Sequence, residues 1–373
     1  KVPTLRFPNY NGEWQKTVMG KVCSFRKGYG IAKDDLSSDG TPCILYGELY
    51  TTYKTAIAKT IKSKTSIQSK SLVYSQKDDV IIPCSGETAE DIATSICVPY
   101  DGVLLGGDLT IVHSDLDGAF LSNQINSVRK YDIARIAQGK SIVHLQADEL
   151  KKIFIFYPSI QEQRKISAFI DKIDERIEIQ NKIIEDLKVL KKELNYSLIG
   201  RIINGKSSNC KIEDVIDYEQ PTNYIVKSDK YIENGETPVL TANKAFLLGY
   251  TIENEGVYNK SDCIILDDFT LDFKYVNFPF KIKSSAIKIL TAKKDIELRY
   301  FYEYLLFLGL TSHEHKRHYI SEIAPLPLYL PSIDEQRSAL SALNSISEKI
   351  KVEENYIIAL KAQKCFFLRA MFI

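Results

Sequence analysis

The chain has 373 residues, of which 44% are hydrophobic and 26% are charged, and its formal net charge is +1. These values are ordinary for a globular protein of two or more domains, and they exclude binding of nucleic acid through a uniformly basic chain. No run approaches the 18 apolar residues of a membrane span, and the polar start lacks the apolar core of a secretory signal. The seven cysteines are scattered without a CxxC pair, which predicts a reducing, cytoplasmic location and no metal site.

Residues 1–157 predict a mixed α+β domain, because short runs rich in β-branched and aromatic residues alternate with turn residues. The runs at 80–82 and 110–112 are typical of strands, and a short helix is expected over 120–138. Tyrosine is frequent, with 22 in the chain. Surface tyrosines beside lysine, asparagine and glutamine suit a nucleic-acid or protein surface.

This first domain contains a basic stretch. No acid occurs between Glu48 and Asp78, whereas lysines recur there among threonines and serines. Lysines and hydroxyls so arranged favour contacts to nucleic-acid phosphates, which position a protein without reading bases. A solvated surface is the alternative interpretation. The lysines predicted to contact phosphate are Lys54, Lys59, Lys62 and Lys64.

Two further groups in the first domain are candidates for reading bases. Glu48 lies among tyrosines and has the acceptor oxygens that recognise the amino group of cytosine, with a structural carboxylate as the alternative. The second group lies around Gly28 and Gly30. The predicted contacts are Arg26, Lys27, Tyr29, Tyr46, Glu48 and Tyr50.

The next stretch, residues 158–204, predicts the first long helix. It opens with the sequence PSIQEQR, in which Ser159 and Glu162 have the spacing of a capping box. Apolar residues then recur in steps of three and four, the spacing of a coiled-coil seam. Gln180 and Lys191 interrupt the seam and are interpreted as devices that fix its register, with simple exposure as the alternative. The seam residues are Ile166, Ile170, Ile173, Ile177, Ile184, Leu187 and Leu194.

Residues 205–330 predict a second α+β domain, with strand-like runs at 263–266 and 286–290 and a short helix at 296–309. Its predicted nucleic-acid contacts follow an expected strand or lie in a basic loop with three histidines. For that loop a solvated surface and a metal cluster are the alternatives. These predicted contacts are Asn243, Lys244, His315, Lys316, Arg317 and His318.

Residues 331–373 predict the second long helix, because the opening motif recurs as PSIDEQR 173 residues after the first copy. The polar interruptions fall at the same offset, at Glu353 and Lys364. Two seams of near-equal length in one chain predict an antiparallel coiled coil and a pseudo-two-fold molecule, with two globular domains separated by the helices. The second seam comprises Leu343, Ile346, Ile350, Ile357, Leu360 and Phe367.

The end of the second helix is apolar on every side, from Cys365 to Ile373. One partner helix does not cover such a surface, so burial against another protein is predicted. An end-on contact with the first domain is the alternative. The predicted partner contacts are Phe366, Met371 and Phe372.

The order of domain, PS(I)xEQR helix, domain and PS(I)xEQR helix resembles the specificity subunits of type I restriction-modification systems over nearly the whole chain. The stretches Gly106–Leu109 and Pro238–Lys244 are also similar to that family. The resemblance implies that each domain is a target-recognition domain that reads one half of a bipartite, asymmetric site in double-stranded DNA. It implies that the helices fix the spacer and dock two methyltransferase subunits, with motor-nuclease subunits in the full complex. The chain itself is then expected to be non-catalytic and to bind no cofactor or metal.

Two other functions are open to the sequence. One is a stand-alone regulator built from a duplicated DNA-binding module. The other is a nucleotide-binding enzyme, because residues 200–207 match the pattern GxxxxGK[ST]. That pattern needs a buried strand before it, whereas here it follows a long helix, so Gly200 or Gly205 is interpreted as a helix stop.

Overall fold

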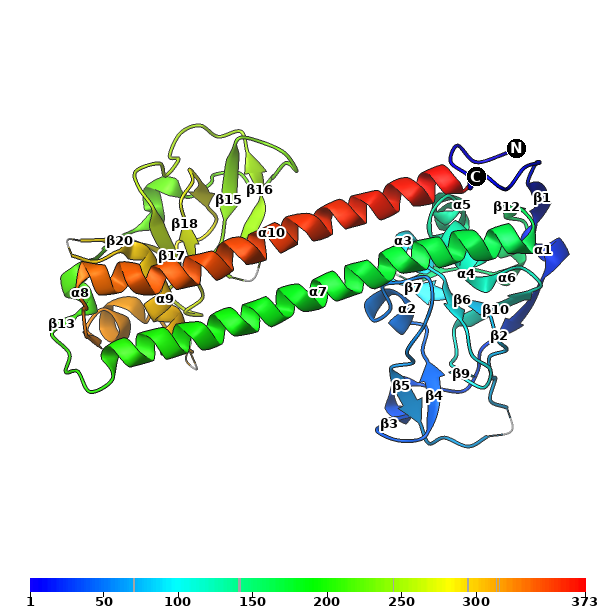
Figure 1. The fold of residues 1–373 in the computed structure, drawn as a ribbon, viewed down its shortest axis with the longest axis horizontal. Helices are drawn as coiled ribbons and strands as arrows, with labels where there is room; N and C mark the ends of the chain where they lie inside the picture. The colour runs from blue at the N-terminus through cyan, green and yellow to red at the C-terminus, as the bar shows by residue number, and fades with distance from the viewer. Residues whose placement is uncertain (70, 140–141, 244, 294, 313, 315) are drawn as a thin grey trace. The chain divides into compact units, whose positions relative to one another are not determined.

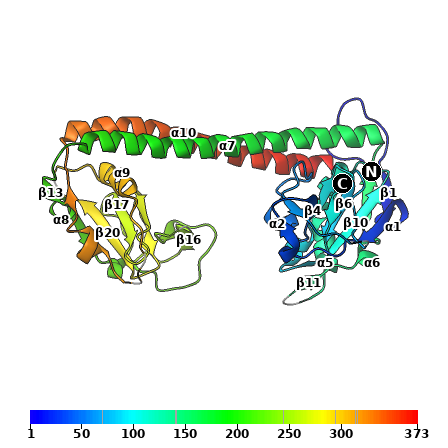
Figure 2. The ribbon, with the colours of Figure 1, turned by 90° about the horizontal axis from the view of Figure 1, so that it is seen from below.

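The computed structural model describes residues 1–69, 71–139, 142–243, 245–293, 295–312, 314 and 316–373. The chain divides into two compact units, which are Lys1–Lys182 with Glu354–Ile373 (unit 1) and Ile183–Glu353 (unit 2). Each unit contains a mixed α/β domain and half of each of two long helices, α7 (Ile160–Ile203) and α10 (Ile333–Met371) (Figure 1). The two helices run in opposite directions alongside each other, which confirms the predicted fold class (Figure 2).

The domain of unit 1 is built on a four-stranded antiparallel sheet in the order β2-β10-β6-β8. A mixed sheet, β3-β5-β4-β9, and the pairs β1-β12 and β11-β7 complete it. Its strands are β1 (Gln15–Val18), β2 (Cys23–Lys27), β3 (Leu36–Ser37), β4 (Thr41–Ile44), β5 (Ser63–Thr65), β6 (Asp79–Pro83), β7 (Ser85–Gly86), β8 (Ile96–Val98), β9 (Leu104–Leu105), β10 (Leu109–Ser114), β11 (Val143–His144) and β12 (Phe154–Tyr157). Its helices are α1 (Met19–Val22), α2 (Glu48–Thr51), α3 (Ala89–Ile92), α4 (Gly118–Asn126), α5 (Lys130–Ile136) and α6 (Ala147–Leu150).

Strand β6 is buried throughout because both faces of its sheet are covered. Successive side chains of a strand point to opposite faces. Val80 and Ile82 therefore join the apolar core that contains Leu121 of α4, whereas Ile81 joins a second core with Ile44 of β4. The single helix predicted over 120–138 is two helices, α4 and α5, because the backbone leaves helical geometry at Ser127.

The domain of unit 2 repeats this plan. Its four-stranded sheet has the order β14-β20-β17-β18, beside the sheet β16-β15-β19 and the pair β13-β21. The strands are β13 (Cys210–Lys211), β14 (Ile216–Glu219), β15 (Thr237–Leu240), β16 (Leu247–Thr251), β17 (Cys263–Asp267), β18 (Phe273–Val276), β19 (Lys281–Ile282), β20 (Ile287–Ala292) and β21 (Pro327–Leu328). The helices are α8 (Ile212–Val215) and α9 (Leu298–Leu308), and α9 lies between the sheet and the long helices (Figure 2).

The strand registers show that the two domains are duplicates. In unit 1, Ile111 of β10 pairs with Ile81 and Arg26 on its two sides. In unit 2, Ile289 of β20 pairs with Ile265 and Glu219 in the same way. In each unit the strand that begins with Thr-Pro, β4 or β15, has a parallel neighbour, β9 or β19. The chain therefore contains the same four-stranded sheet twice, with different side chains on it.

The seam residues of both long helices are buried or half-buried in the unit to which each belongs. In unit 1, the ring of Phe169 packs edge-on against that of Phe367, with 4.8 Å between the ring centroids. The ammonium of Lys364 pairs with the buried carboxylate of Asp174 at 2.6 Å. Lys191, the seam lysine of the first copy, pairs instead with Glu303 of α9 at 2.8 Å. Lys364 thus joins the two long helices, whereas Lys191 joins α7 to its domain.

Each long helix begins with a buried glutamine of the repeated motif that binds the domain beside it. Gln163 accepts from the backbone N–H of Asp117 at 2.9 Å and donates to the carbonyl of Pro158 at 2.9 Å. Gln336 accepts from the N–H of Glu297 at 2.8 Å and donates to the carbonyl of Pro331 at 3.0 Å. Asp117 and Glu297 are the N-cap residues of α4 and α9. In both copies of the motif, the glutamine therefore ties the start of the long helix to the N-cap of the domain helix beside it.

The capping box predicted at both helix starts is present in the second copy alone. The backbone N–H of Ser332 donates to the Glu335 carboxylate at 2.9 Å, and the backbone N–H of Glu335 donates to the Ser332 hydroxyl at 3.4 Å. In the first copy Glu162 is instead paired with Arg6 at 2.7 Å, so the prediction for Ser159 is wrong. The Glu162 carboxylate, which was expected to cap the helix, accepts hydrogen bonds from Arg6, 156 positions earlier in the chain.

The chain's first and last residues lie together in unit 1, at the end of α10 (Figure 1). The N–H of Leu5 donates to the carbonyl of Ala370 at 2.9 Å, and Arg129 donates to the carbonyl of Ile373. In unit 2, α7 ends at Ile203, and Gly205 follows with a φ of +72°, which glycine adopts readily. Gly200 lies inside the helix, so Gly205 is the helix stop and the nucleotide-binding interpretation of residues 200–207 is wrong.

Candidate nucleic-acid interface

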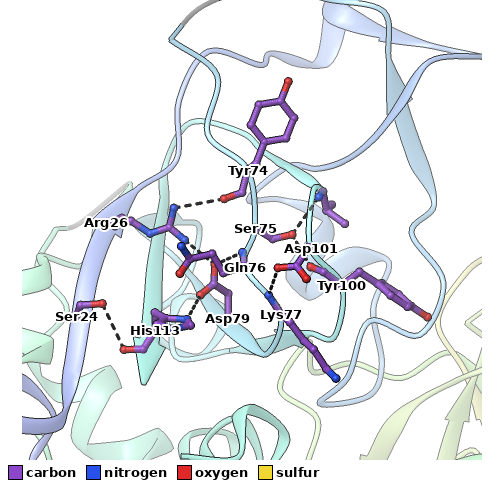
Figure 3. Close-up of polar contacts among 11 residues, drawn as sticks. Ser24, Arg26, Tyr74, Ser75, Gln76, Lys77, Asp79, Tyr100, Asp101 and His113 are labelled. Carbon is purple, nitrogen blue, oxygen red and sulfur yellow. Dashed lines mark hydrogen bonds and ion pairs between the residues drawn. The ribbon is translucent and has the colours of Figure 1, made fainter. Parts of the chain in front are cut away.

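Arg26, a predicted base contact, is held within the sheet of unit 1 (Figure 3). Its guanidinium pairs with buried Asp79 at 2.6 Å and donates to the carbonyl of Tyr74 at 3.3 Å. The other oxygen of Asp79 lies 2.8 Å from Nδ1 of His113. Because a buried carboxylate needs a cationic or hydrogen-bonding partner, Arg26 balances the charge of Asp79. Its side chain is 36% exposed, and its contact with DNA stays a prediction.

Glu48 is a structural carboxylate, which agrees with the alternative interpretation of this residue. One oxygen accepts from the N–H of Leu45 at 2.7 Å and the other from the hydroxyl of Ser63 at 2.6 Å. Tyr50 is half-buried, and burial raises the pKa of its phenol. Tyr46, at 37% exposure, is the member of this group that faces solvent.

The predicted phosphate-binding lysines separate into two kinds. Lys59 pairs with Asp171 at 2.6 Å and Glu175 at 3.0 Å, both on α7, so it joins the domain to its helix. Lys54, Lys62 and Lys64 are exposed, and none of them has an ion pair with any residue that the structure describes. They remain the candidates for phosphate contact.

The basic loop of unit 2 is largely paired within itself. His318 is 3% exposed, with Nδ1 2.7 Å from Glu322, and that hydrogen bond raises the pKa of the imidazole. Lys316 pairs with Glu314 at 2.6 Å and with Glu322 at 2.9 Å. The prediction for His318 is wrong, because its ring is buried inside the loop. Lys316 is 50% exposed, and its contact with DNA stays a prediction.

Two predicted contacts of unit 2 remain open to a ligand. Arg317 is exposed, and its guanidinium lies over the ring of Phe269 at 5.9 Å. Asn243 is exposed at the end of β15, where its side-chain oxygen accepts from the N–H of Ala245 at 3.1 Å. Lys244 and His315 lie outside the residues that the structure describes.

Lys27 is exposed at a polar hollow of about 600 Å³ in unit 1, and Tyr29, two residues further along the chain, is exposed as well. The hollow lies where β2 and β6 end and β10 begins. Sequence reasoning missed its other members, although Asp108 belongs to the stretch Gly106–Leu109 that resembles the family. The lining residues are Lys27, Cys84, Ser85, Asp108, His144, Leu145, Gln146, Ala147 and Asp148.

Gly28 allows two chain segments to meet beside this hollow. A β-carbon at this position would lie 2.0 Å from the carbonyl oxygen of Gly106, whereas one at Gly107 would have no atom within 4 Å. We expect Gly28→Ala to lower the free energy of unfolding by about 1–3 kcal/mol, because backbone must move. Gly107→Ala is the control, with an expected change within about 0.5 kcal/mol. Urea unfolding followed by Trp14 fluorescence compares them, and equal losses would contradict the prediction.

The partner contacts predicted at the end of α10 are partly wrong. Met371 and Phe372 are each 3% exposed, in a cluster with Trp14, Phe120 and Ile166. The end-on contact with the first domain therefore covers them. Phe366 is 60% exposed and remains open to a partner.

Neither a membrane span nor a metal cluster is found in the part of the chain that the structure describes. No helix there is long and apolar enough to cross a bilayer. No group of three or more histidine, cysteine, aspartate or glutamate residues there is placed to hold a metal ion.

Residues 11–189 match the family model described as the type I restriction modification DNA specificity domain. This match covers just under half of the chain and shows that residues 11–189 belong to the DNA specificity domains of type I restriction-modification systems. Among curated proteins the chain is similar to the EcoR124I/EcoR124II specificity subunit of Escherichia coli, with 40% identity over 139 residues. This alignment covers 36% of the chain and 34% of that protein.

Further similarities are more distant. The pre-mRNA-processing protein PRP40 of Saccharomyces cerevisiae is 29% identical over 209 residues, which cover 53% of the chain and 33% of PRP40. The chain thus aligns with about a third of the length of each of these curated relatives. The type I S subunit from M. genitalium has the same fold, with a TM-score of 0.62 at 17% identity over 100% of this chain and 99% of that one. A chain from a study of complex assembly in a type I R-M system gives a TM-score of 0.58 at 16% sequence identity. The alignment covers 96% of this chain and 97% of that one.

Proposed function

We propose that each unit reads one half of a bipartite DNA target and that the two half-sites differ in sequence. The observation that carries the proposal is the duplicated sheet, whose registers agree in the two units while the side chains at its exposed edges differ. Two domains with the same four-stranded sheet suit the reading of two half-sites in the same DNA. Different side chains on equivalent backbone suit different base sequences.

The long helices are proposed to hold the two reading domains at a set spacing. Their buried seams and the glutamine bonds at their starts supply stiffness along each helix and at its junction with a domain. Half-sites read from one face of DNA lie about one turn apart, on the order of 10 bp. The accepted spacer would then follow from helix length.

Two methyltransferase subunits are the proposed partners, with motor-nuclease subunits in a complete restriction complex, in the cytoplasm. Support comes from exposed apolar side chains on the long helices, since such residues on a helix surface favour burial against another protein. In unit 1 they are Ile179, Tyr356, Ile358 and Phe366, and in unit 2 they are Ile183, Val189, Leu190, Tyr196 and Val352.

Replacing Lys54, Lys62 and Lys64 together with alanine should weaken binding to every DNA sequence alike. Removing one phosphate-binding lysine should flatten the dependence of log K on log salt by roughly 1, so the triple variant should flatten it by about 3. Fluorescence anisotropy across a salt series measures this slope. Lys59→Ala is the matched control, because its ammonium is paired with α7 and its removal should leave the slope unchanged. Weaker binding confined to one target sequence would contradict the assignment.

Methylation mapping in the host, with and without this gene, tests the proposed function. A split motif that disappears with the gene is the expected result. The alternative, a stand-alone DNA-binding regulator, predicts an unchanged methylome and no association of the full chain with methyltransferase subunits in a pull-down. Either of those outcomes would overturn the proposal.

A further inference from the structure

The two units place different chemistry at the same edge of their equivalent sheets. Past the end of β6, the N–H of Cys84 donates to the carbonyl of Asp108 at 2.7 Å. Past the end of β17, the N–H of Asp268 donates to the carbonyl of Ala286 at 2.9 Å. Both bonds continue the ladder between equivalent strands. Cys84 therefore occupies the position that Asp268 has in unit 2.

A third segment joins this edge in the same way in both units. The N–H of Leu145 donates to the carbonyl of Cys84 at 2.9 Å, and the N–H of His318 donates to that of Asp268 at 3.0 Å. The preceding residues, His144 and Arg317, are consequently equivalent.

The neighbouring strand supplies one more equivalent pair. Lys27, the last residue of β2, pairs with Thr110 of β10. The same register extended by one residue beyond β14 aligns Gln220 with Lys288 of β20. Lys27 and Gln220 are therefore equivalent, as are Thr110 and Lys288.

In unit 1 this edge is an open hollow of about 600 Å³ with both donors and acceptors. Lys27 supplies an ammonium, and the hydroxyl of Ser85 lies 3.2 Å from Nδ1 of His144. Asp108 and Asp148 supply carboxylates. A phosphate is repelled by two carboxylates, whereas the edge of a base pair in the major groove presents acceptors and amino donors side by side. The mixture therefore suits a base edge better than a backbone phosphate.

In unit 2 the side chains at the equivalent positions contact one another. Lys288 lies 3.5 Å from Asp268, and both are 1% exposed. Gln220 accepts from Lys288 at 2.9 Å, and the ring of Phe269 lies beneath the guanidinium of Arg317 at 5.9 Å. Gln220 and Arg317 remain exposed at this edge. Of the two, Arg317 has a planar fork of donors that matches two acceptors of guanine.

We propose that this edge reads base edges in both units, with Lys27 and His144 as the specificity-determining residues of unit 1 and Arg317 as that of unit 2. The inference rests on the proposed function, since it requires each unit to face DNA. It assigns to each unit a residue that contacts bases, and separates these residues from Lys62 and Lys64, which are assigned to phosphate.

The test exchanges residues between the equivalent positions. Lys27→Gln introduces the residue that unit 2 carries, and Arg317→His introduces the residue that unit 1 carries. Both side chains are exposed, so folding should be preserved, which far-UV circular dichroism checks. The full chain, assembled with its methyltransferase subunits, methylates a library of duplexes randomised in both half-sites, and sequencing reports the preference at each base. Lys62→Gln is the matched control for loss of one exposed lysine.

We expect Lys27→Gln to reduce discrimination roughly tenfold at one or two positions of one half-site, and Arg317→His to do the same in the other. Lys62→Gln should lower methylation of all sequences alike. A uniform loss for Lys27→Gln and Arg317→His, as for a phosphate contact, would overturn the inference, as would unchanged preferences. If the wild-type chain confers no split preference, the proposed function itself fails, which is a distinct outcome.

Discussion

Replacing Gln163 with leucine is expected to lower the free energy of unfolding of unit 1 by about 2–4 kcal/mol, because two buried backbone groups lose their hydrogen-bond partner. The side chain is 2% exposed, and its amide joins the N–H of Asp117 to the carbonyl of Pro158. Leucine has a similar volume, so the cavity contribution is small. The cost arises from a donor and an acceptor left without partners where water does not reach them.

Trp14 makes this measurement specific to unit 1. It is the one tryptophan of the chain, it is 3% exposed, and it belongs to the cluster that includes Ile166 one turn beyond Gln163. Urea unfolding followed by its fluorescence should show the loss, while Gln161→Leu, on the exposed side of the same turn, should change stability by no more than about 0.5 kcal/mol. Similar midpoints for the two variants would show that the glutamine bonds are dispensable.

Deleting one heptad from each long helix should alter the accepted spacer or abolish modification, while the preference at each half-site stays the same. In the register set by two pairings, Asp174 with Lys364 and Arg176 with Tyr356, the segments 178–184 and 351–357 lie opposite each other. Removing seven residues preserves the seam and shortens each helix by roughly 10 Å. That length corresponds to about 3 bp of DNA at 3.4 Å per step.

Methylome sequencing of the double deletion reads spacer and half-sites at once. The control is deletion of 178–184 alone, which shifts one seam against the other and should destabilise the helix pair in thermal unfolding. An unchanged target in a double-deletion protein that is folded and active would refute the idea that helix length sets the spacer.

The long helices could be predicted from the sequence because seam spacing depends on near neighbours in the chain. The seam residues Ile166 and Leu343 are buried at 1% exposure each. Strand-rich domains were predictable as a class, but the pairing of β4 with β9 in parallel was not, because it joins residues about 60 positions apart. Local patterns carry no information on such distant partners.

The candidate site was harder to predict, since the role of a polar side chain depends on what the fold brings to it. Arg26 meets Asp79, and Lys59 meets Asp171 on a helix more than a hundred residues later. Both contacts give a cation that was predicted to bind DNA an ion pair within its own unit. Lys27, two places from Tyr29 in the same predicted loop, stays accessible. Nothing in the local sequence distinguishes it from Arg26.

The meeting of the chain's two ends in unit 1 bears on synthesis. Unit 2, Ile183–Glu353, is one continuous stretch, so all of its residues are translated before the final twenty. Unit 1 needs Glu354–Ile373 to cover Trp14 and Phe120. A nascent chain therefore carries the domain of unit 1 with an uncovered aromatic surface until these residues are made, and a product terminated before them would expose that surface to chaperones and proteases.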